Sequence, residues 1–270
     1  MTISVLPLML GLAAALSLVM VLAWAAAERS GKSGWVDAIW SFAVGGAGTA
    51  AALVPLPASG ATTTRQWLVA ALVVLWSLRL GTHIVARTRG GGDDPRYAQL
   101  RAEWGGDAAR RMFWFLQAQA AAALPLVISI LVAARRPGDL GIADMLGLLV
   151  LLAAIGGEAL ADHQLAQFRA DPANKGKVCT AGLWRWSRHP NYFFEWLAWV
   201  AYAVIAIDPS GHHPWGWLAL GGPLLMYWLL VHVSGVPPLE AHMLRSRGEQ
   251  FRAYQARTSR FFPWFPGVAR

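Results

Sequence analysis

The chain has 270 residues, of which 56% are hydrophobic and 14% charged, and its mean hydropathy is +0.41. Soluble domains carry about 25% charged residues, so this composition excludes an ordinary soluble domain and predicts a membrane protein. The 15 tryptophans point the same way, because indole rings favour the membrane–water interface. The net charge of +8 fits basic loops that obey the positive-inside rule, so we expect phosphate-bearing small ligands and no nucleic acid.

The single cysteine, Cys179, excludes an intrachain disulfide and a cysteine-based zinc site. His212 and His213 are adjacent on the predicted outer side, and no H-E-x-x-H pattern occurs in the chain. The sequence therefore favours a protein with no metal site.

Apolar stretches recur along the chain, and each approaches the length of about 20 residues that a spanning helix needs. They predict an all-α fold, a multipass bundle of seven transmembrane helices in a single domain over residues 1–270, and we expect a monomer. The sixth stretch is the shortest. The stretches are 4–27, 36–55, 67–86, 112–134, 140–160, 191–207 and 215–236.

Charge is distributed unevenly between the two ends of this bundle. Residues 28–34, 87–111, 161–190 and 237–270 share one side and hold 19 Lys and Arg, whereas the opposite side holds 3. This asymmetry predicts an N-terminus outside and a C-terminus in the cytosol, in the inner membrane if the protein is bacterial. The first stretch ends in Ala25-Ala26-Ala27, like a cleavable signal, but it lacks a positive n-region and is too long, so we expect a retained helix.

Ionisable residues lie within these stretches or at their ends, where they are costly unless they face the bundle interior or water. Interfacial snorkelling or structural ion pairing is the alternative for any one of them. Most cluster toward the predicted cytosolic side, which favours a shared polar cavity there. They are Asp37, Arg79, His83, Arg87, Glu158, Asp162, Glu195 and His232.

Two predicted cytosolic loops carry residues suited to a nucleotide. Residues 87–111 combine arginines, carboxylates and glycines that permit close approach to phosphate, although a solvated turn capped by Asp94-Pro95 explains them equally well. Residues 162–195 interleave cations, including Lys175 and Arg185, with aromatic faces, amides and carboxylates. An adenine–ribose–pyrophosphate ligand needs this mixture, whereas binding of anionic lipid, the alternative, does not need the carboxylates.

The run G-L-W-R-W-S-R-H-P-N-Y-F-F-E at 182–195, with Asp162-His163-Gln164, resembles the steroid 5α-reductase superfamily, most closely its bacterial branch of unknown function. Further matches are Asp94–Tyr97, Pro238–Glu240 and the tail from Tyr254 to Pro266, so the resemblance extends almost from Asp37 to the C-terminus. Isoprenylcysteine and phospholipid methyltransferases share the H-P-x-Y core.

The resemblance implies NADPH as cofactor, held by the two cytosolic loops and the tail 237–270. Asp162, Arg169, Asn191 and Glu195 match the family's cofactor-contacting positions. To these we add, as residues of suitable chemistry, Arg79, Arg87, Tyr97, Lys175, Arg185, His189, Tyr192, His232, Glu240 and Tyr254.

The family reaction reduces a carbon–carbon double bond conjugated to a ketone, so the expected substrate is a lipid-soluble, steroid-like enone reached from the membrane lipid. Animal steroid reductases place a Glu on the second helix and a Tyr on the third; this chain offers Asp37 and Trp76 there, and we expect both to be catalytic. Indole N–H donates a hydrogen bond but cannot deliver a proton, so Asp37 is the expected acid, with helix capping as its alternative role. An S-adenosylmethionine-dependent lipid methyltransferase is the second hypothesis, and a non-enzymatic lipid-binding scaffold the third.

Overall fold

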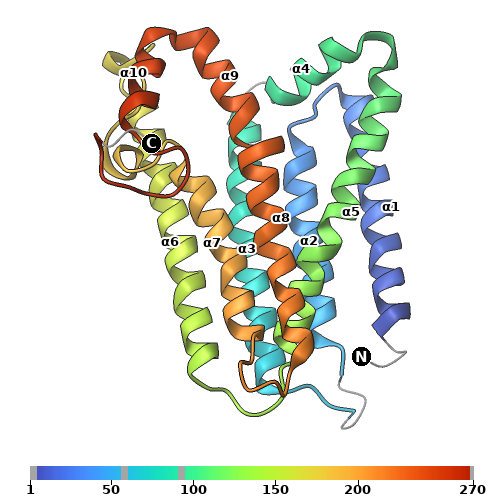
Figure 1. Ribbon diagram of the computed structural model, residues 1–270. Helices are drawn as coiled ribbons and strands as arrows, with labels where there is room; N and C mark the ends of the chain where they lie inside the picture. The colour runs from blue at the N-terminus through green and yellow to red at the C-terminus, as the bar shows by residue number, and fades with distance from the viewer. Residues whose placement is uncertain (1–4, 56–59, 91–94, 268–270) are drawn as a thin grey trace. The chain divides into compact units, whose positions relative to one another are not determined.

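The computed structural model describes residues 5–55, 60–90 and 95–267, and every regular element within them is helical, which confirms the all-α fold class. Short 3₁₀ turns include η1 (Gly105–Asp107) and η3 (Gly182–Arg185), and η5 (Leu229–Val233) is π-helical. The α-helices are α1 (Val5–Ser30), α2 (Trp35–Leu53), α3 (Thr64–Gly90), α4 (Pro95–Trp104), α5 (Ala108–Ala134), α6 (Ile142–Ala170), α7 (Pro190–Ala206), α8 (Gly221–Trp228), α9 (Val236–Arg247) and α10 (Glu249–Arg257) (Figure 1).

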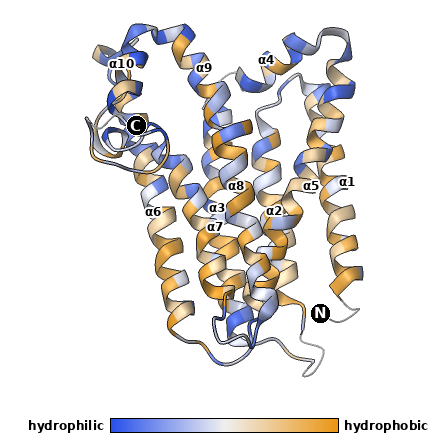
Figure 2. Cartoon of the chain, viewed as in Figure 1, coloured by the Kyte–Doolittle hydropathy of each residue, from blue (hydrophilic) through white to orange (hydrophobic). Residues whose placement is uncertain are grey.

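Six helical stretches of the described chain are long and apolar enough to cross a membrane, so the protein is an integral multipass membrane protein. Figure 2 shows apolar residues along the lengths of α1 and α5 and hydrophilic residues along α4 and α10. The stretches are Val5–Ser30, Trp35–Leu53, Thr64–Gly90, Arg96–Ala134, Ile142–Ala170 and Pro214–Arg247. The predicted sixth span corresponds to α7, whose 17 residues lie at the short end of the usual range, so a seventh span and the orientation stay predictions.

The described chain divides into two compact units. Unit 1 comprises Met1–Met145 and Tyr202–Gly222, and unit 2 comprises Leu146–Ala201 and Pro223–Arg270. The predicted single domain over the whole chain stays a prediction.

Small residues let α2, α3 and α5 pack closely in unit 1. A Cβ added at Gly45 would lie 2.1 Å from Ser77 Oγ, and one at Gly48 would lie 2.6 Å from Ile130 Cδ1. Ser77 Oγ also donates a 3.0 Å hydrogen bond to the carbonyl oxygen of Ser41. Helices in lipid gain association energy from such van der Waals contact and interhelical hydrogen bonds, because lipid leaves little hydrophobic driving force between them.

A buried ion pair closes one end of unit 1. Arg65, at the start of α3, meets Asp144, at the start of α6, through two parallel bonds of 2.7 and 2.8 Å. Their side chains are 3% and 1% exposed, and Arg65 also donates to the carbonyl oxygens of Arg136 and Gly138. The bidentate hydrogen bonds between the guanidinium and the carboxylate compensate for the desolvation of both charges. Arg65 and its acceptors therefore hold the 135–141 connection against α3.

The opposite end of unit 1 is fastened by α4. Arg101 Nη2 of α4 lies 2.6 Å from Glu28 Oε1 near the end of α1, and its Nε donates to Ser33 Oγ. Thr88 Oγ1 of α3 donates to the carbonyl oxygen of Gly34, which precedes α2. These contacts hold the polar ends of α1, α2, α3 and α4 together and thereby position the residues of α4.

In unit 2 the C-terminal tail folds back onto the segment before α7. Ser187 Oγ donates to the carbonyl oxygen of Phe261, and the Trp264 amide donates to the carbonyl oxygen of Trp186. An aromatic cluster forms beneath these bonds, with ring centroids 5.2 to 6.1 Å apart. Its members are Phe193, Trp196, Tyr227, Phe261 and Phe262.

Helical structure extends further than the sequence analysis expected. Residues 161–190 were assigned to a loop, but α6 continues to Ala170, so Asp162 and Arg169 lie on its last turns. The expected loop 87–111 contains the end of α3, all of α4, η1 and the start of α5. Good helix formers such as Leu, Gln and Ala extend α6 beyond its apolar stretch. Asp93 and Asp94 lie outside the described residues.

Candidate functional site

The first polar cluster lies in unit 1 and centres on Asp37, in the first turn of α2. Its Oδ1 accepts a 2.7 Å hydrogen bond from the hydroxyl of Tyr97, and its Oδ2 forms an ion pair with Arg96. Gln119 of α5 donates from Nε2 to the same hydroxyl at 3.3 Å. Tyr97 is only 3% exposed, whereas the Asp37 side chain is 23% exposed, so a buried phenol meets a carboxylate that solvent still reaches.

Local structure explains why these residues meet. Helix α4 starts at Pro95, which suits a first helical position, and this places Arg96 and Tyr97 in its first turn. Trp40 Nε1 donates to the carbonyl oxygen of Gln119 at 3.1 Å and so holds α2 against α5. The guanidinium of Arg96 lies 5.7 Å from the centroid of the Tyr97 ring, within cation–π range.

Asp37 does not cap α2. The N-cap position belongs to Gly34, and no side chain caps that end. The alternative reading of Asp37 as a capping residue is therefore wrong, and its carboxylate is free to hold Tyr97 and Arg96.

The other unit 1 residues predicted for the site lie on α3. Trp76 is buried, at 1% exposure, among the residues that α3 turns inward. Arg79 is half-buried one turn later, and Arg87 is exposed in the last turn. Their predicted catalytic and cofactor roles stay predictions.

The second polar cluster lies in unit 2 and centres on Glu240 of α9. Its Oε1 lies 3.0 Å from His189 Nε2 and accepts a 2.8 Å hydrogen bond from Arg188 Nε, while its Oε2 accepts one from Gln255. Arg188 Nη1 also donates to the carbonyl oxygen of Thr258 at 2.6 Å. The cluster therefore joins the segment before α7 to both α9 and α10.

His189 is a buried base within this cluster, at 2% exposure. Burial lowers its pKa below the ordinary value, and the hydrogen bond that it donates to Glu240 only partly opposes this shift. A neutral ring that donates from Nε2 to Glu240 leaves Nδ1 as an acceptor, and no described residue bonds to that buried atom. The ring also stacks on Tyr192, with centroids 5.6 Å apart and planes 9° apart.

The first turns of α7 bring the other expected cofactor residues toward the end of α6. Asn191 Nδ2 donates to Asp162 Oδ1 at 3.3 Å, which pairs an amide with a carboxylate. Glu195 is buried one turn further along, where Trp199 Nε1 donates to its Oε1 at 3.1 Å. The structure thus pairs Asp162 with Asn191, and it brings His189 into contact with both Glu240 and Tyr192.

Tyr254 has a defined structural task. Its hydroxyl donates to the carbonyl oxygens of Trp184 and Ser187, at 2.5 and 3.3 Å, and its side chain is 2% exposed. Burial raises the pKa of this phenol well above its ordinary value. Tyr254 therefore anchors α10 to the 184–187 turn, a role that its place in the sequence did not reveal.

The cations expected to meet phosphate are exposed around unit 2. Arg169 lies in the last turn of α6, while Lys175 and Arg185 lie between α6 and α7. His232 is exposed on η5, and its ring meets the edge of Tyr227 at 5.8 Å.

An open cavity of about 330 Å³ lies beside the end of α6. Asp171 and Asn174 contribute polar groups to it, and Gly182 approaches so closely that a Cβ there would lie 2.4 Å from Gln164 Oε1. Cys179 also lines the cavity, but burial raises the pKa of its thiol, which disfavours the reactive thiolate. Within the described ranges, no group of three His, Cys, Asp or Glu residues is placed to hold a metal ion.

Comparison with known proteins gives a family but no activity. The model of a family described as proteins of unknown function, DUF1295, matches residues 23–258. An uncharacterised protein of Schizosaccharomyces pombe is 32% identical over 106 residues, which are 37% of this chain and 28% of the yeast protein. The chain thus matches less than a third of that relative's length. No solved structure matches the chain.

Proposed function

We propose that this chain, which belongs to the DUF1295 family of unknown function, is a membrane reductase. In this proposal it uses NADPH to saturate the carbon–carbon double bond of a lipid-soluble enone. The hydrogen bond between the buried Tyr97 hydroxyl and Asp37 carries this proposal. Enone reduction builds negative charge on the carbonyl oxygen, and a positioned hydroxyl that both donates a hydrogen bond and delivers a proton is suited to that charge.

Tyr97, which the sequence analysis placed among the cofactor residues, takes the donor role in this scheme in place of Asp37, whose carboxylate pairs with Arg96. When the enone binds, the single O–H hydrogen of Tyr97 would turn from Asp37 to the carbonyl oxygen of the enone, and the guanidinium of Arg96 adds positive charge beside it. Asp37 and Gln119 hold the Tyr97 hydroxyl in place. Trp76 is less suited to this task, because its N–H cannot deliver a proton.

NADPH, when bound, would supply the hydride that the β-carbon takes up, and the electron pair of the double bond would then shift toward the carbonyl oxygen that Tyr97 faces. Tyr97 Oη holds the proton that the α-carbon finally takes up, and water restores it afterwards. The balance is one hydride and one proton added to the carbon–carbon bond.

The donors in unit 2 fit such a cofactor. Arginine and lysine side chains suit the phosphates, and the Asp162–Asn191 pair offers an acceptor and donors for ribose hydroxyls or a carboxamide. His189 Nδ1 is a buried acceptor that no described residue satisfies, and a ligand N–H or O–H is a partner of the required kind. The cavity beside α6 is smaller than a whole dinucleotide, so it suits only one end of the molecule.

A cofactor-dependent thermal shift tests this proposal. The protein is purified in mild detergent, and its unfolding midpoint is measured with NADPH, NADH or S-adenosylmethionine. A ligand that binds only the folded state raises the midpoint, and we expect NADPH to do so. A shift with S-adenosylmethionine alone would assign a methyltransferase instead, and no shift with any of the three would favour the scaffold hypothesis.

A further inference from the structure

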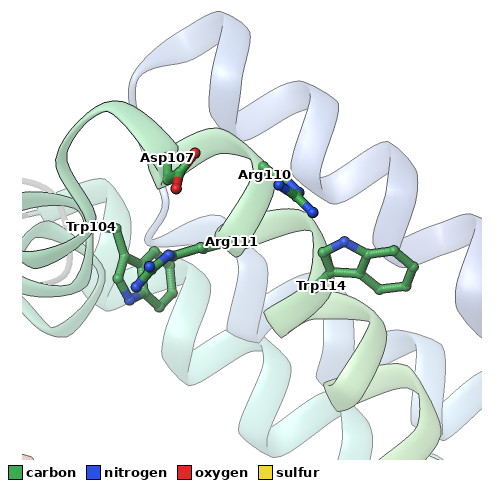
Figure 3. Close-up of a pocket in the computed structure, with 5 residues that line it drawn as sticks. All are labelled: Trp104, Asp107, Arg110, Arg111 and Trp114. Atoms are coloured by element: carbon green, nitrogen blue, oxygen red, sulfur yellow. The ribbon is translucent and has the colours of Figure 1, made fainter.

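A second open cavity, lined by none of the residues of the Asp37 cluster, lies in unit 1 at the junction of α4, η1 and α5 (Figure 3). Its volume is about 410 Å³. Trp104 ends α4, Asp107 belongs to η1, and Arg110, Arg111 and Trp114 lie on the first turns of α5. In Figure 3 the guanidinium of Arg111 extends toward Trp104, and that of Arg110 extends toward Trp114.

The two guanidiniums are exposed and uncompensated. Throughout the described part of the chain, no carboxylate lies within ion-pair distance of Arg110 or Arg111. The first turns of a helix disfavour cations, because its dipole is positive there, so these arginines do not stabilise α5 through its dipole. With Asp107 as the single acid of the lining, the cavity carries a net positive charge.

The position of the cavity along α5 is equally informative. From Met112 to Ala134 the chain contains no Asp, Glu, Lys, Arg or His, and this apolar run starts directly after Arg111. The cavity therefore lies where a spanning helix passes from hydrocarbon to headgroup depth. Trp114 is 63% exposed at this level, which suits an indole in contact with lipid.

We propose that this cavity binds the headgroup of an anionic phospholipid, with phosphatidylglycerol as its model ligand. Arg110 and Arg111 hold the phosphate by charge-assisted hydrogen bonds, and Trp104 and Trp114 pack against the glycerol and the first acyl carbons. A free phosphate would satisfy the guanidiniums but would leave most of the Trp114 ring, which contacts Phe113 and is 63% exposed, without lipid to cover it. This site is independent of the reductase proposal, since it involves none of the residues assigned to NADPH or the enone.

Native mass spectrometry of the detergent-purified full chain tests the site. Phosphatidylglycerol and phosphatidylcholine are titrated against the wild type and against Arg110→Gln/Arg111→Gln. Each basic residue at a membrane surface contributes on the order of fivefold to anionic lipid affinity, so we expect the double variant to bind phosphatidylglycerol about 10- to 30-fold more weakly. The affinity for phosphatidylcholine should stay low and unchanged.

The matched control removes two other exposed cations of unit 1, Arg29→Gln/Lys32→Gln, and should leave affinity within about twofold. Arg110→Lys/Arg111→Lys keeps the charge and should restore most of the binding, which separates a lost site from misfolding. The proposal is overturned if both double Gln variants lose affinity equally, or if phosphatidylcholine binds as tightly as phosphatidylglycerol. Displacement of the lipid by millimolar inorganic phosphate would assign the cavity to a free anion, and displacement by NADPH would assign it to the cofactor; either result also overturns it.

Discussion

The hydroxyl of Tyr97 donates a 2.7 Å hydrogen bond to Asp37, although 60 residues separate the two in the chain. The bond joins the first turn of α4 to the first turn of α2, and the neighbouring Arg96 forms an ion pair with the same carboxylate. The proposed donation to an enone requires this single O–H hydrogen to turn from Asp37 to the carbonyl oxygen of the substrate, and each member of the cluster can be substituted to test this.

Replacement of Tyr97 by Phe should lower enone reduction by about 10²–10⁴-fold, because the hydroxyl supplies both the hydrogen bond and the proton. NADPH affinity should change little, because the proposal gives Tyr97 a role toward the enone and no longer toward the cofactor. Turnover and the NADPH-dependent thermal shift are measured on the same preparation. Trp76→Phe is the matched control, and a larger loss of turnover there would return the donor role to Trp76.

Substitution of Asp37 should likewise lower the rate of enone reduction without lowering the affinity for NADPH. Asp37→Ala frees Tyr97 and Arg96 from their shared acceptor, so reduction should fall while the NADPH-dependent shift persists. Equal loss of cofactor binding in Asp37→Ala and Arg169→Ala would contradict this division of roles.

Arg169→Ala should weaken NADPH binding without removing the chemistry. The lost guanidinium is one of the exposed cations assigned to phosphate, and hydrogen bonds to charged groups contribute about 1.5–3 kcal/mol each, or roughly 10- to 150-fold in affinity. Fluorescence titration of NADPH gives the dissociation constant. Lys177→Ala, which removes a nearby exposed cation outside the predicted set, should bind NADPH like the wild type.

The ion pair of Arg65 and Asp144 should matter for stability and not for catalysis. Asp144→Asn leaves a buried guanidinium without its counter-charge, a defect that typically costs about 3–5 kcal/mol. We expect a clearly lower thermal midpoint and a normal NADPH-dependent shift in the protein that remains folded. Glu249→Gln breaks the exposed pair with Arg252 and should leave the midpoint nearly unchanged. Equal effects of the two substitutions would argue against the burial of Arg65.

His189 should make stability fall as the solution is acidified. Burial lowers its pKa in the folded state, so between that value and about 6.5 the unfolded chain binds more protons than the folded chain. The free energy of unfolding therefore rises with pH through this window. Below the window, the contribution of neutral His189 to stability is absent. Thermal midpoints measured from pH 7.5 down to 5.5 should drop, and the drop should be smaller in His189→Gln. An identical change of the thermal midpoint with pH in both proteins would assign the titration to a group other than His189.

Much of the fold could be predicted from apolar run length alone. Apolar stretches long enough to span the hydrocarbon core of a membrane predict the positions of α1, α2, α3, α5 and α6. The extension of α6 to Ala170 could not be predicted in this way, because a helix needs suitable backbone propensity and not apolar side chains to continue into water.

The sequence predicted which residues belong to the candidate site, but it did not predict which of them contact one another. Asp37, Tyr97, His189 and Glu240 were singled out from the sequence, but their contacts were not, since Tyr97 reaches Asp37 and His189 reaches Glu240 across 60 and 51 residues. Such pairings depend on the packing of separate helices, which local patterns do not encode. Tyr254 shows the reverse case, because its hydroxyl has a structural task on backbone carbonyl oxygens.

The most direct measurement follows the hydride itself. The purified protein in detergent is given NADPH carrying deuterium at nicotinamide C4, with a panel of enone steroids, quinones and fatty enals, and each product is analysed by mass spectrometry and NMR. We predict that at least one enone gains a single deuterium at its β-carbon and that Tyr97→Phe suppresses this gain. Oxidation of NADPH with no label in any product, or equal labelling by Tyr97→Phe, would contradict the account.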